Sequence, residues 1–215
     1  VLLSQSLPFF RDVPLLAYLT GREWLPSASK FGVLPLLSGT LLVTVGAGLL
    51  ALPLGLLSAI FLAEYASPGV RRVLKPALEL LAGVPTVVYG YLGLYFITPF
   101  FRRFVPEMDT TNALAGAIVV AIMILPLVSS LCEDAISSVP KALREGAYGL
   151  GATKAETIKR IVVPGAFSGI MASFILALSR AFGETMAVTL AAGATANLTA
   201  DPRSSVQTMT AYIVN

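Results

Sequence analysis

The sequence has no histidine, a single cysteine and few charged residues. The absence of histidine excludes a histidine-based catalytic triad and the usual zinc-hydrolase centre. The lone Cys132 excludes an internal disulfide and a cysteine metal cluster. Charged side chains make up 13% of the chain and hydrophobic ones 56%, whereas soluble domains carry about twice that share of charge. This composition indicates an integral membrane protein.

The few basic residues are dispersed. The net charge is +3, and lysines and arginines lie in gaps between long apolar runs rather than in one cluster. A nucleic-acid binder would gather them on one face, so we expect no nucleic-acid partner. The chain also has no Walker-type glycine loop. It is therefore not expected to hydrolyse nucleotides itself.

Four apolar runs are long enough to cross a bilayer. They cover residues 31–63, 80–101, 110–132 and 164–192, the last one interrupted by two charges. Each reaches the ~20 residues that a spanning helix needs, and the first exceeds it, which predicts a short lead-in, a tilt or a re-entrant start. An open sheet cannot satisfy its backbone in lipid, so the spans must be helical. Charges interrupt every apolar stretch of residues 1–30, and nothing there resembles a signal peptide.

The basic gaps set the orientation. One gap follows the first run and another follows the third, and together they hold Arg71, Arg72, Lys75, Lys141, Arg144, Lys154, Lys159 and Arg160. By the positive-inside rule both gaps face the cytoplasm. Residues 1–33 and 193–215 are then extracytoplasmic segments, on either side of a transmembrane domain at 34–192. Trp24 is expected either to anchor at the outer interface or to pack within its loop.

The cytoplasmic loop 133–163 is predicted to form two short helices. Pro140 suits a first helical turn, and this first helix should run to about residue 150. Gly151 is placed for a left-handed cap at its end. Thr153 to Glu156 fits a capping box that opens the second helix. Spacing alone leaves two interpretations open: an amphipathic helix lying on the lipid surface, or a docking surface for a soluble partner.

The same loop resembles the EAA signature of ABC importer permeases. That signature reads E-A-A, three residues, G, nine residues, I, one residue, L-P. The matching positions are Glu145, Gly146, Ala147, Gly151, Ile161, Val163 and Pro164. Gly146 replaces the second alanine and Val163 the leucine. In the family this stretch is the coupling helix, which sits in a groove on the nucleotide-binding subunit, so the resemblance implies ATPase coupling through these residues.

Other segments narrow the resemblance. Residues 39–44, 83–90, 180–187 and 207–213 are similar to the PstC-type permease subunit of the bacterial phosphate importer. The resemblance covers nearly the whole chain. It implies the type I importer (MetI-like) fold, an all-α integral membrane bundle with six spans. Four are evident, so we expect one before Val1, one after Asn215 and a chain that is an incomplete copy.

The resemblance also implies a set of partners. These are a PstA-like permease subunit in a heterodimer, two ATP-binding subunits, an extracytoplasmic phosphate-binding protein and the lipid of the bacterial inner membrane. The chain itself would bind no cofactor and would catalyse no reaction. ATP and magnesium would be held by the ATP-binding subunits.

The second run is repeatedly broken by glycine and proline. The breaks are at Gly83, Pro85, Gly90, Gly93 and Pro99. Such breaks are tolerated in lipid where they face protein or a wet cavity. One interpretation is a pathway-lining or hinge segment in which Thr86 and Tyr89 offer hydroxyls. The other is close helix packing through small residues.

Arg180 and Glu184 are charges inside the fourth run. Each is unfavourable in lipid by at least ~2.5 kcal/mol, and their i, i+4 spacing predicts one shared helix face. They could be a self-neutralising pair that packs against a neighbouring subunit. Alternatively, the arginine fork is a transient site for phosphate oxygens, Glu184 holds the guanidinium, and Ser179, Thr185 and Thr189 add hydroxyls. The family carries an arginine and a glutamate here, associated with substrate passage.

These observations favour a permease subunit of an ATP-driven, binding-protein-dependent phosphate importer. Three alternatives remain. The first keeps the architecture and changes the cargo to sulfate, molybdate or another oxyanion. The second is a stand-alone secondary transporter or channel in which Glu184 carries protons, although no inverted repeat is visible. The third is a membrane scaffold, in which Arg180 and Glu184 would be replaceable together by apolar residues.

Overall fold

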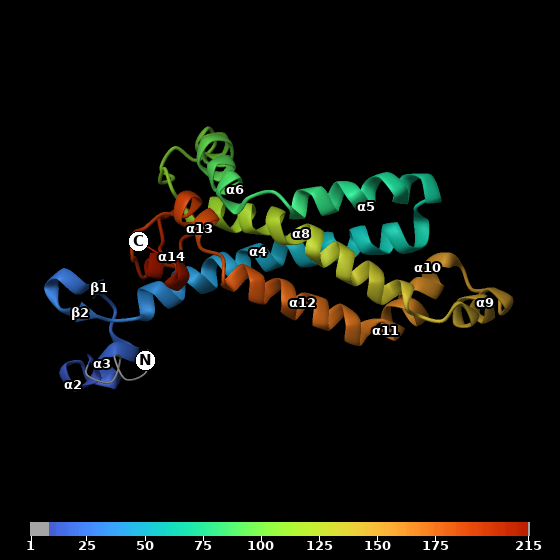
Figure 1. The fold of residues 1–215 in the computed structure, drawn as a ribbon, viewed down its shortest axis with the longest axis horizontal. Coiled ribbons are helices and arrows are strands. Elements are labelled where there is room, and N and C mark those ends of the chain that lie inside the picture. Colours follow the sequence, from blue (N-terminus) through green and yellow to red (C-terminus); the bar gives the residue numbers. More distant parts are fainter. Residues whose placement is uncertain (1–8, 215) are drawn as a thin grey trace. The chain divides into compact units, whose positions relative to one another are not determined.

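The structure is a computed structural model that describes residues 9–214 (Figure 1). The first eight residues of the predicted N-terminal segment lie outside the described residues. The N-terminal part contains α2 (Phe9–Asp12), α3 (Leu15–Thr20), strand β1 (Trp24–Leu25), the 3-10 turn η1 (Pro26–Ala28) and strand β2 (Lys30–Phe31). The two strands pair antiparallel, Trp24 with Phe31 and Leu25 with Lys30. The rest of the described chain is helical or irregular.

The remaining elements follow the predicted spans and loops. They are α4 (Leu34–Ile60), the π-helix η2 (Phe61–Tyr65), α5 (Pro68–Ala82), α6 (Thr86–Leu92), the π-helix η3 (Gly93–Ile97), α7 (Thr98–Arg102), α8 (Ala113–Ser137), α9 (Lys141–Gly149), α10 (Lys154–Thr157), the π-helix η4 (Ile158–Val162), α11 (Val163–Gly165), α12 (Phe167–Phe182), α13 (Met186–Ala191) and α14 (Met209–Val214).

Two unbroken helices are long and apolar enough to cross a membrane. One runs from Leu34 to Tyr65 and the other is α8. Two broken pairs pass the same test if each is counted as one span, α5 with α6–α7 and Lys154–Gly165 with α12, which brings the total to four. If the first pair is one span, it begins at Pro68 rather than near residue 80 and is broken between α5 and α6. The second pair is broken between α11 and α12, and the apolar run predicted at 164–192 is interrupted again between α12 and α13.

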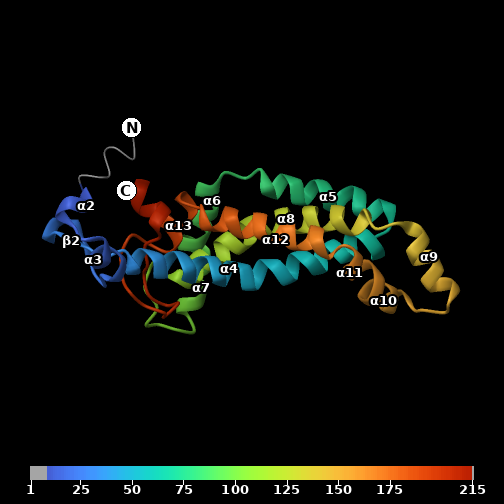
Figure 2. The same cartoon turned by 90° about the horizontal axis from the view of Figure 1, so that it is seen from below.

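The chain divides into two compact units, which are described separately. The first contains Val1–Gly46, Thr86–Val120 and Phe182–Asn215, and the second contains Ala47–Pro85 and Ala121–Ala181. In the second unit, α8 lies between α5 and α12 in both views (Figures 1 and 2). Small residues allow this packing. A Cβ on Gly55 of α4 would lie 2.6 Å from Val128 of α8, and one on Gly169 of α12 would lie 2.6 Å from Ala135.

A buried charge links α5 to α8 in the second unit. Glu133 has a fully buried side chain that forms ion pairs with Arg71 and with Lys75, the latter at 3.0 Å. Lys75 also lies 3.4 Å from Asp134. A charge buried in an apolar surrounding requires such partners. The basic residues that interrupt the apolar pattern near 71–75 therefore belong to a helix and not to a loop.

In the first unit, glycines bring α6 and η3 against α13. A Cβ on Gly90 would lie 2.9 Å from Leu190, and one on Gly93 would lie 2.7 Å from both Ala191 and Val119. Both glycines are therefore packing positions, as one of the two sequence interpretations proposed. The Gly83–Pro85 segment instead marks the break between α5 and α6.

Aromatic rings organise the N-terminal part of the first unit. The Trp24 ring meets Tyr18, Phe31 and Tyr212 edge-to-face, with centroids 6.4, 6.2 and 5.0 Å away. Such edge-to-face pairs stabilise beyond their buried area. Trp24 therefore packs against rings of its own segment, as one expectation held, and also against Tyr212 of α14.

The loop after α13 closes over the start of α8. The backbone N–H groups of Ala113 and Leu114 donate to the carbonyls of Ser204 and Pro202, at 3.0 and 2.8 Å. The N–H of Ala115 donates to the Asn112 side chain at 2.8 Å. The first N–H groups of a helix have no partner within it. Here a segment about ninety residues later in the sequence supplies two of the acceptors.

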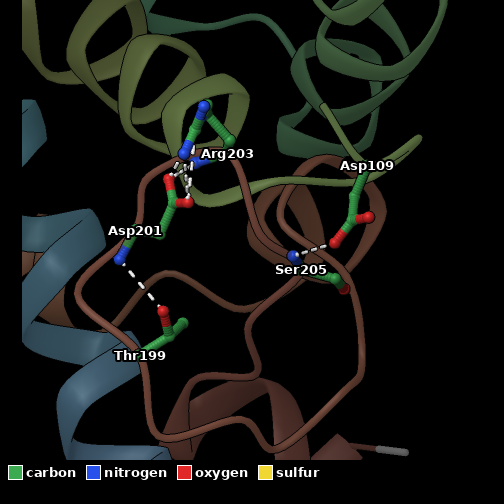
Figure 3. A network of polar contacts seen from close by, with 5 residues as sticks. All are labelled: Asp109, Thr199, Asp201, Arg203 and Ser205. Carbon is green, nitrogen blue, oxygen red and sulfur yellow. Dashed lines mark hydrogen bonds and ion pairs between the residues drawn. The ribbon is translucent and has the colours of Figure 1, made fainter. Parts of the chain in front are cut away.

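Side chains hold this loop in place (Figure 3). The Nε and Nη2 of Arg203 both donate to the Asp201 carboxylate, and the bond from Nη2 is 2.8 Å long. The Asp201 N–H donates to Thr199 Oγ1, and the Ser205 N–H donates to Asp109 Oδ2 at 2.8 Å. The Arg203 side chain lowers the pKa of the Asp201 carboxyl, and a backbone hydrogen bond from Arg203 adds to this effect.

Candidate functional site

In the predicted loop 133–163, residues 133–137 extend α8, and the rest forms the two short helices that the sequence predicts. The first helix, α9, follows Pro140 and ends at Gly149. Its Ala147 is buried, while Glu145, Gly146 and Tyr148 are exposed. The helix therefore packs through the small alanine and presents the glutamate and the glycine outward. No atom lies within 4 Å of a Cβ built on Gly146, so the surface around this position is open.

The turn between the two helices is also confirmed. Gly151 has φ +84°, the left-handed conformation expected from its position. The Ala152 N–H donates to the Ala147 carbonyl at 3.0 Å. The Thr153 hydroxyl accepts from the Glu156 N–H, and the Glu156 carboxylate accepts from the Thr153 N–H at 2.9 Å. This reciprocal pair is the predicted capping box.

The second half of the loop turns into the fourth span. Ile158 and Val162 are buried, Ile161 is half-buried, and Pro164 is exposed within α11. The helices Lys154–Gly165 and Phe167–Phe182 then meet at 69°. α9 and α10 extend past the ends of α8 and α12 in both views (Figures 1 and 2). All six predicted coupling residues therefore lie on one projecting loop: Glu145, Gly146, Ala147, Gly151, Ile161 and Pro164.

Arg144, which directly precedes the signature, is a residue that the sequence reasoning did not single out. Its side chain is only 15% exposed and bonds to Glu64 and to two backbone carbonyls. The sequence around Arg144 does not predict this contact, because Arg144 is one of several basic residues in the loop and its acidic partner Glu64 lies 80 positions earlier.

Arg180 and Ser179 occupy the last turn of α12, in the second unit, and both are exposed. The Ser179 hydroxyl donates to the Ile175 carbonyl one turn earlier, at 2.8 Å. Within the described part of its own unit, the Arg180 guanidinium has no hydrogen bond or ion pair. An arginine in a predicted span without a local partner is available for a ligand or for another chain.

Glu184 does not continue the helix of Arg180. α12 ends at Phe182 and α13 begins at Met186, so the expectation that both charges share one helix face is wrong. The sequence Gly183-Glu184-Thr185 breaks the helix, and glycine is the residue most able to leave it. The half-buried Glu184 instead accepts from the Ala187 N–H at 3.2 Å and so caps α13.

The remaining predicted path residues belong to the first unit. Thr185 lies in the break, where its hydroxyl donates to the Gly183 carbonyl at 3.3 Å. Thr86 begins α6, which packs directly on α13 through Gly90. Thr86 is thus the first residue of α6, and the Glu184–Thr185 segment directly precedes α13, the helix on which α6 packs. Among residues 9–214, no group of three acidic or cysteine side chains could hold a metal ion.

Solved structures with a similar arrangement define the class of fold. One is a chain of the MetNI methionine ABC transporter in inward-facing conformations, with a TM-score of 0.55 and 20% identity over 71% of this chain and 68% of that one. Another is an amino acid ABC transporter crystallised with histidines, with a TM-score of 0.51 and 22% identity over 89% of this chain and 88% of that one. The fold is that of an ABC importer permease.

Sequence comparisons give the family. Residues 51–214 match the model described as binding-protein-dependent transport system inner membrane component, and this chain belongs to that family of membrane proteins. It is 43% identical to the probable ABC transporter permease protein YqgH of Bacillus subtilis over 91% of its length, and 37% identical to the phosphate transport system permease protein PstC of Mesorhizobium japonicum over 93%. The predicted resemblance to PstC-type permeases is confirmed.

The match does not extend over the full relatives. This chain spans 64% of the Bacillus protein, 67% of the Mesorhizobium protein and 62% of the PstC of Haemophilus influenzae, to which it is 35% identical.

Proposed function

We propose that this chain is the permease subunit of an ATP-driven importer that carries inorganic phosphate across the bacterial inner membrane. It would form the path with a second, PstA-like permease subunit. Two cytoplasmic ATP-binding subunits would supply the energy, and an extracytoplasmic binding protein would deliver the anion. In this arrangement the chain itself catalyses no reaction.

The observation that carries this proposal is the projecting part of the predicted loop, residues 138–163, called the coupling loop below. It joins a signature that departs from the family pattern only at Gly146 and Val163 to a well-defined local geometry: a short helix, a left-handed glycine and a capping box. The exposed face of α9, with Glu145 and Gly146, is open to a partner. A helix with apolar residues toward its own protein and a charged, open face outward suits insertion into a groove of a soluble subunit.

Phosphate as cargo is supported by Arg180 and by the relatives that carry phosphate transport in their names. The guanidinium is permanently charged, and its planar donors match phosphate oxygens in pairs. Ser179, on the same helix as Arg180, would add a hydroxyl beside the guanidinium. In the first unit, Glu184 would act by fixing the start of α13, and Thr86 and Thr185 stay candidate hydroxyl donors predicted from the sequence.

The proposed cycle uses these parts in sequence. The loaded binding protein docks outside, ATP binding draws the two coupling loops of the heterodimer together, and the spans change from inward-facing to outward-facing. The anion then passes by way of the Arg180 guanidinium, and hydrolysis resets the complex. Because the site only has to hold the anion transiently, a single cation is more suitable than a closed cage.

Docking is tested by replacing Glu145 with lysine in the complete complex, reconstituted in liposomes. We expect phosphate uptake to fall to background while the subunit still inserts and is recovered in the membrane. Glu107→Lys is the matched control, since it makes the same charge change at an exposed position of the predicted outer loop. Normal ATP-dependent uptake in Glu145→Lys would refute the docking role.

The path is tested by replacing Arg180 with glutamine, with Arg103→Gln as the control at an exposed arginine of the predicted outer loop. We expect Arg180→Gln to abolish phosphate uptake without disturbing assembly. Competition by unlabelled sulfate and molybdate tests the cargo. Strong inhibition by either would favour another oxyanion, and uptake by the purified chain without ATP would favour a secondary transporter.

A further inference from the structure

Arg144 ties the coupling helix α9 to two other helices of the second unit. Its Nη1 donates to the Val139 carbonyl at 2.6 Å and its Nη2 to the Ile136 carbonyl at 2.8 Å. Ile136 lies in the last turn of α8 and Val139 just beyond it. Its Nε donates to Glu64 Oε1 at 3.1 Å, and Glu64 belongs to η2, the π-helical end of the first span.

The geometry leaves little freedom to this contact. The Arg144 side chain is 15% exposed and that of Glu64 is 8% exposed. Each of the three guanidinium nitrogens has a different acceptor, so the plane of the group is fixed in orientation. One acceptor is the Ile136 carbonyl in the last turn of α8, where the helix carries the negative end of its dipole, and another is the Val139 carbonyl just beyond that turn.

The same π-helical segment also holds the second helix of the coupling loop. The ammonium group of Lys154, the first residue of α10, lies 4.6 Å from the centre of the Tyr65 ring. Neighbouring residues of η2, Glu64 and Tyr65, therefore contact α9 and α10 respectively. A cation over an aromatic face is attractive at this distance, so the end of the first span touches both helices of the loop.

Two routes thus lead from the coupling loop into the membrane part of the second unit. One is covalent, through η4 and α11 into α12. The other is non-covalent, through Arg144 to η2 and to the end of α8. The bend of 69° before α12 makes the covalent route a joint between two helices rather than one continuous rod. The non-covalent route crosses no such joint, because η2 continues α4 directly.

We propose that Arg144 is a positioning residue that transmits movement of the coupling loop to the first span through Glu64. The proposal rests on the function proposed above, since it assumes that an ATP-binding subunit moves α9. It assigns a role to a residue outside the docking face and outside the anion path. It also explains why a permanently charged fork is buried directly beside the signature: only arginine reaches two carbonyls and a carboxylate at once.

The first test measures coupling in the reconstituted complex as phosphate transported per ATP hydrolysed. Arg144→Gln should lower this ratio about fivefold or more, the range of a typical coupling energy, while ATP hydrolysis continues. Arg144→Lys should not restore it, because one ammonium cannot replace the fork. Arg72→Gln is the matched control, since Arg72 is an exposed arginine of α5, in the same unit, without an ion pair among the described residues.

A double-variant cycle separates transmission from general loss of structure. Glu64→Gln should lower the ratio less than Arg144→Gln, because the two carbonyl bonds remain. The double variant should be no worse than Arg144→Gln alone if the two side chains act as one unit. Additive losses would overturn the proposed route through Glu64.

The second test does not depend on the cargo. Spin labels on cysteines introduced at Leu150, which is 91% exposed, and at Leu57 of α4, which is 63% exposed, report how the loop follows the first span. In the complete complex their distance distribution should stay narrow with and without a non-hydrolysable ATP analogue, and should broaden in Arg144→Gln. A pair at Leu150 and Met171 of α12 follows the covalent route and should be unaffected.

The outcomes are distinguishable from failure of the proposed function. An equally narrow Leu150–Leu57 distribution in Arg144→Gln overturns the inference, whatever the complex transports. A broadened distribution in a complex that carries no phosphate leaves the positioning role standing and refutes the cargo instead. An unchanged ratio of phosphate to ATP in Arg144→Gln also overturns it.

Discussion

Replacing the buried Glu133 and replacing its two cationic partners should have unequal effects on stability. Glu133→Gln removes the anion and leaves Arg71 and Lys75, whose side chains are 42% and 33% exposed. The double variant Arg71→Gln/Lys75→Gln does the reverse and leaves a carboxylate that is 0% exposed. Both perturbations remove the two ion pairs of Glu133. The double variant also removes the 3.4 Å contact of Lys75 with the exposed Asp134, but such an exposed pair contributes only about 0–1 kcal/mol, so a larger difference reports which charge is left behind.

The structure gives the expected magnitudes. The half-exposed cations can turn toward water, so Glu133→Gln should lower the free energy of unfolding by about 1–2 kcal/mol, as for the loss of charged hydrogen bonds. The fully buried carboxylate cannot be rehydrated in place, so the double variant should cost about 3–5 kcal/mol. For a protein of this size, about 1 kcal/mol corresponds to roughly 2–4 °C in Tm.

The assay is thermal unfolding of the detergent-solubilised complex at neutral pH, followed by loss of helical circular dichroism. Arg72→Gln is the matched control: its side chain is exposed, it neighbours Arg71, and it has no ion pair among residues 9–214. Its Tm should match that of the unchanged protein. A Glu133→Gln variant that is as unstable as the double variant, or an equal loss in Arg72→Gln, would refute the reasoning.

Three further predictions concern glycine positions and pH. Gly93→Ala places a Cβ 2.7 Å from Ala191 and should cost about 1–3 kcal/mol of unfolding free energy by overpacking, measured as above. Gly146→Ala and Gly151→Ala both add a methyl group in open space. The first should stabilise the α9–α10 segment by up to about 1 kcal/mol, whereas the second should destabilise it by a similar amount because Gly151 has a φ of +84°. The helicity of a peptide of residues 139–165 measures both effects. The pKa of Asp201 lies below its ordinary value. The contact between Asp201 and Arg203 is therefore fully present above the ordinary pKa and is lost as the pH falls through the lowered pKa. Hydrogen exchange in residues 199–206, corrected for intrinsic rates, should rise over that acidic range in the unchanged protein and should be elevated at every pH in Asp201→Asn.

Sequence reasoning located the features that depend on local signals. Apolar run length located the two unbroken spans because a bilayer sets a minimum helix length. Capping chemistry located the turn between α9 and α10, since Pro140, Gly151 and the Thr153–Glu156 pair each have one preferred place in a helix. These signals act over a few residues and do not require knowledge of the tertiary contacts.

It failed where distant residues decide. Arg71 and Lys75 were expected in a loop between spans, because the sequence does not show that they pair with Glu133, which lies about sixty positions later. Arg180 and Glu184 read as one helix face because spacing alone cannot show that Gly183 ends α12. Glycine lowers helix stability by only about 1 kcal/mol, which a buried helix often tolerates, so the break is decided by packing of α13 and by the cap that Glu184 provides.

The acceptors for Ala113 and Leu114 have a consequence for biosynthesis. During translation α8 leaves the ribosome long before residues 202–204 exist, so its leading end has no carbonyl partners when it first meets the translocon. Water or lipid headgroups must serve that end until the later segment has crossed the bilayer. In a nascent chain halted before residue 202, the first turn of the third span should therefore stay in the headgroup region, with its N–H groups hydrogen-bonded to water.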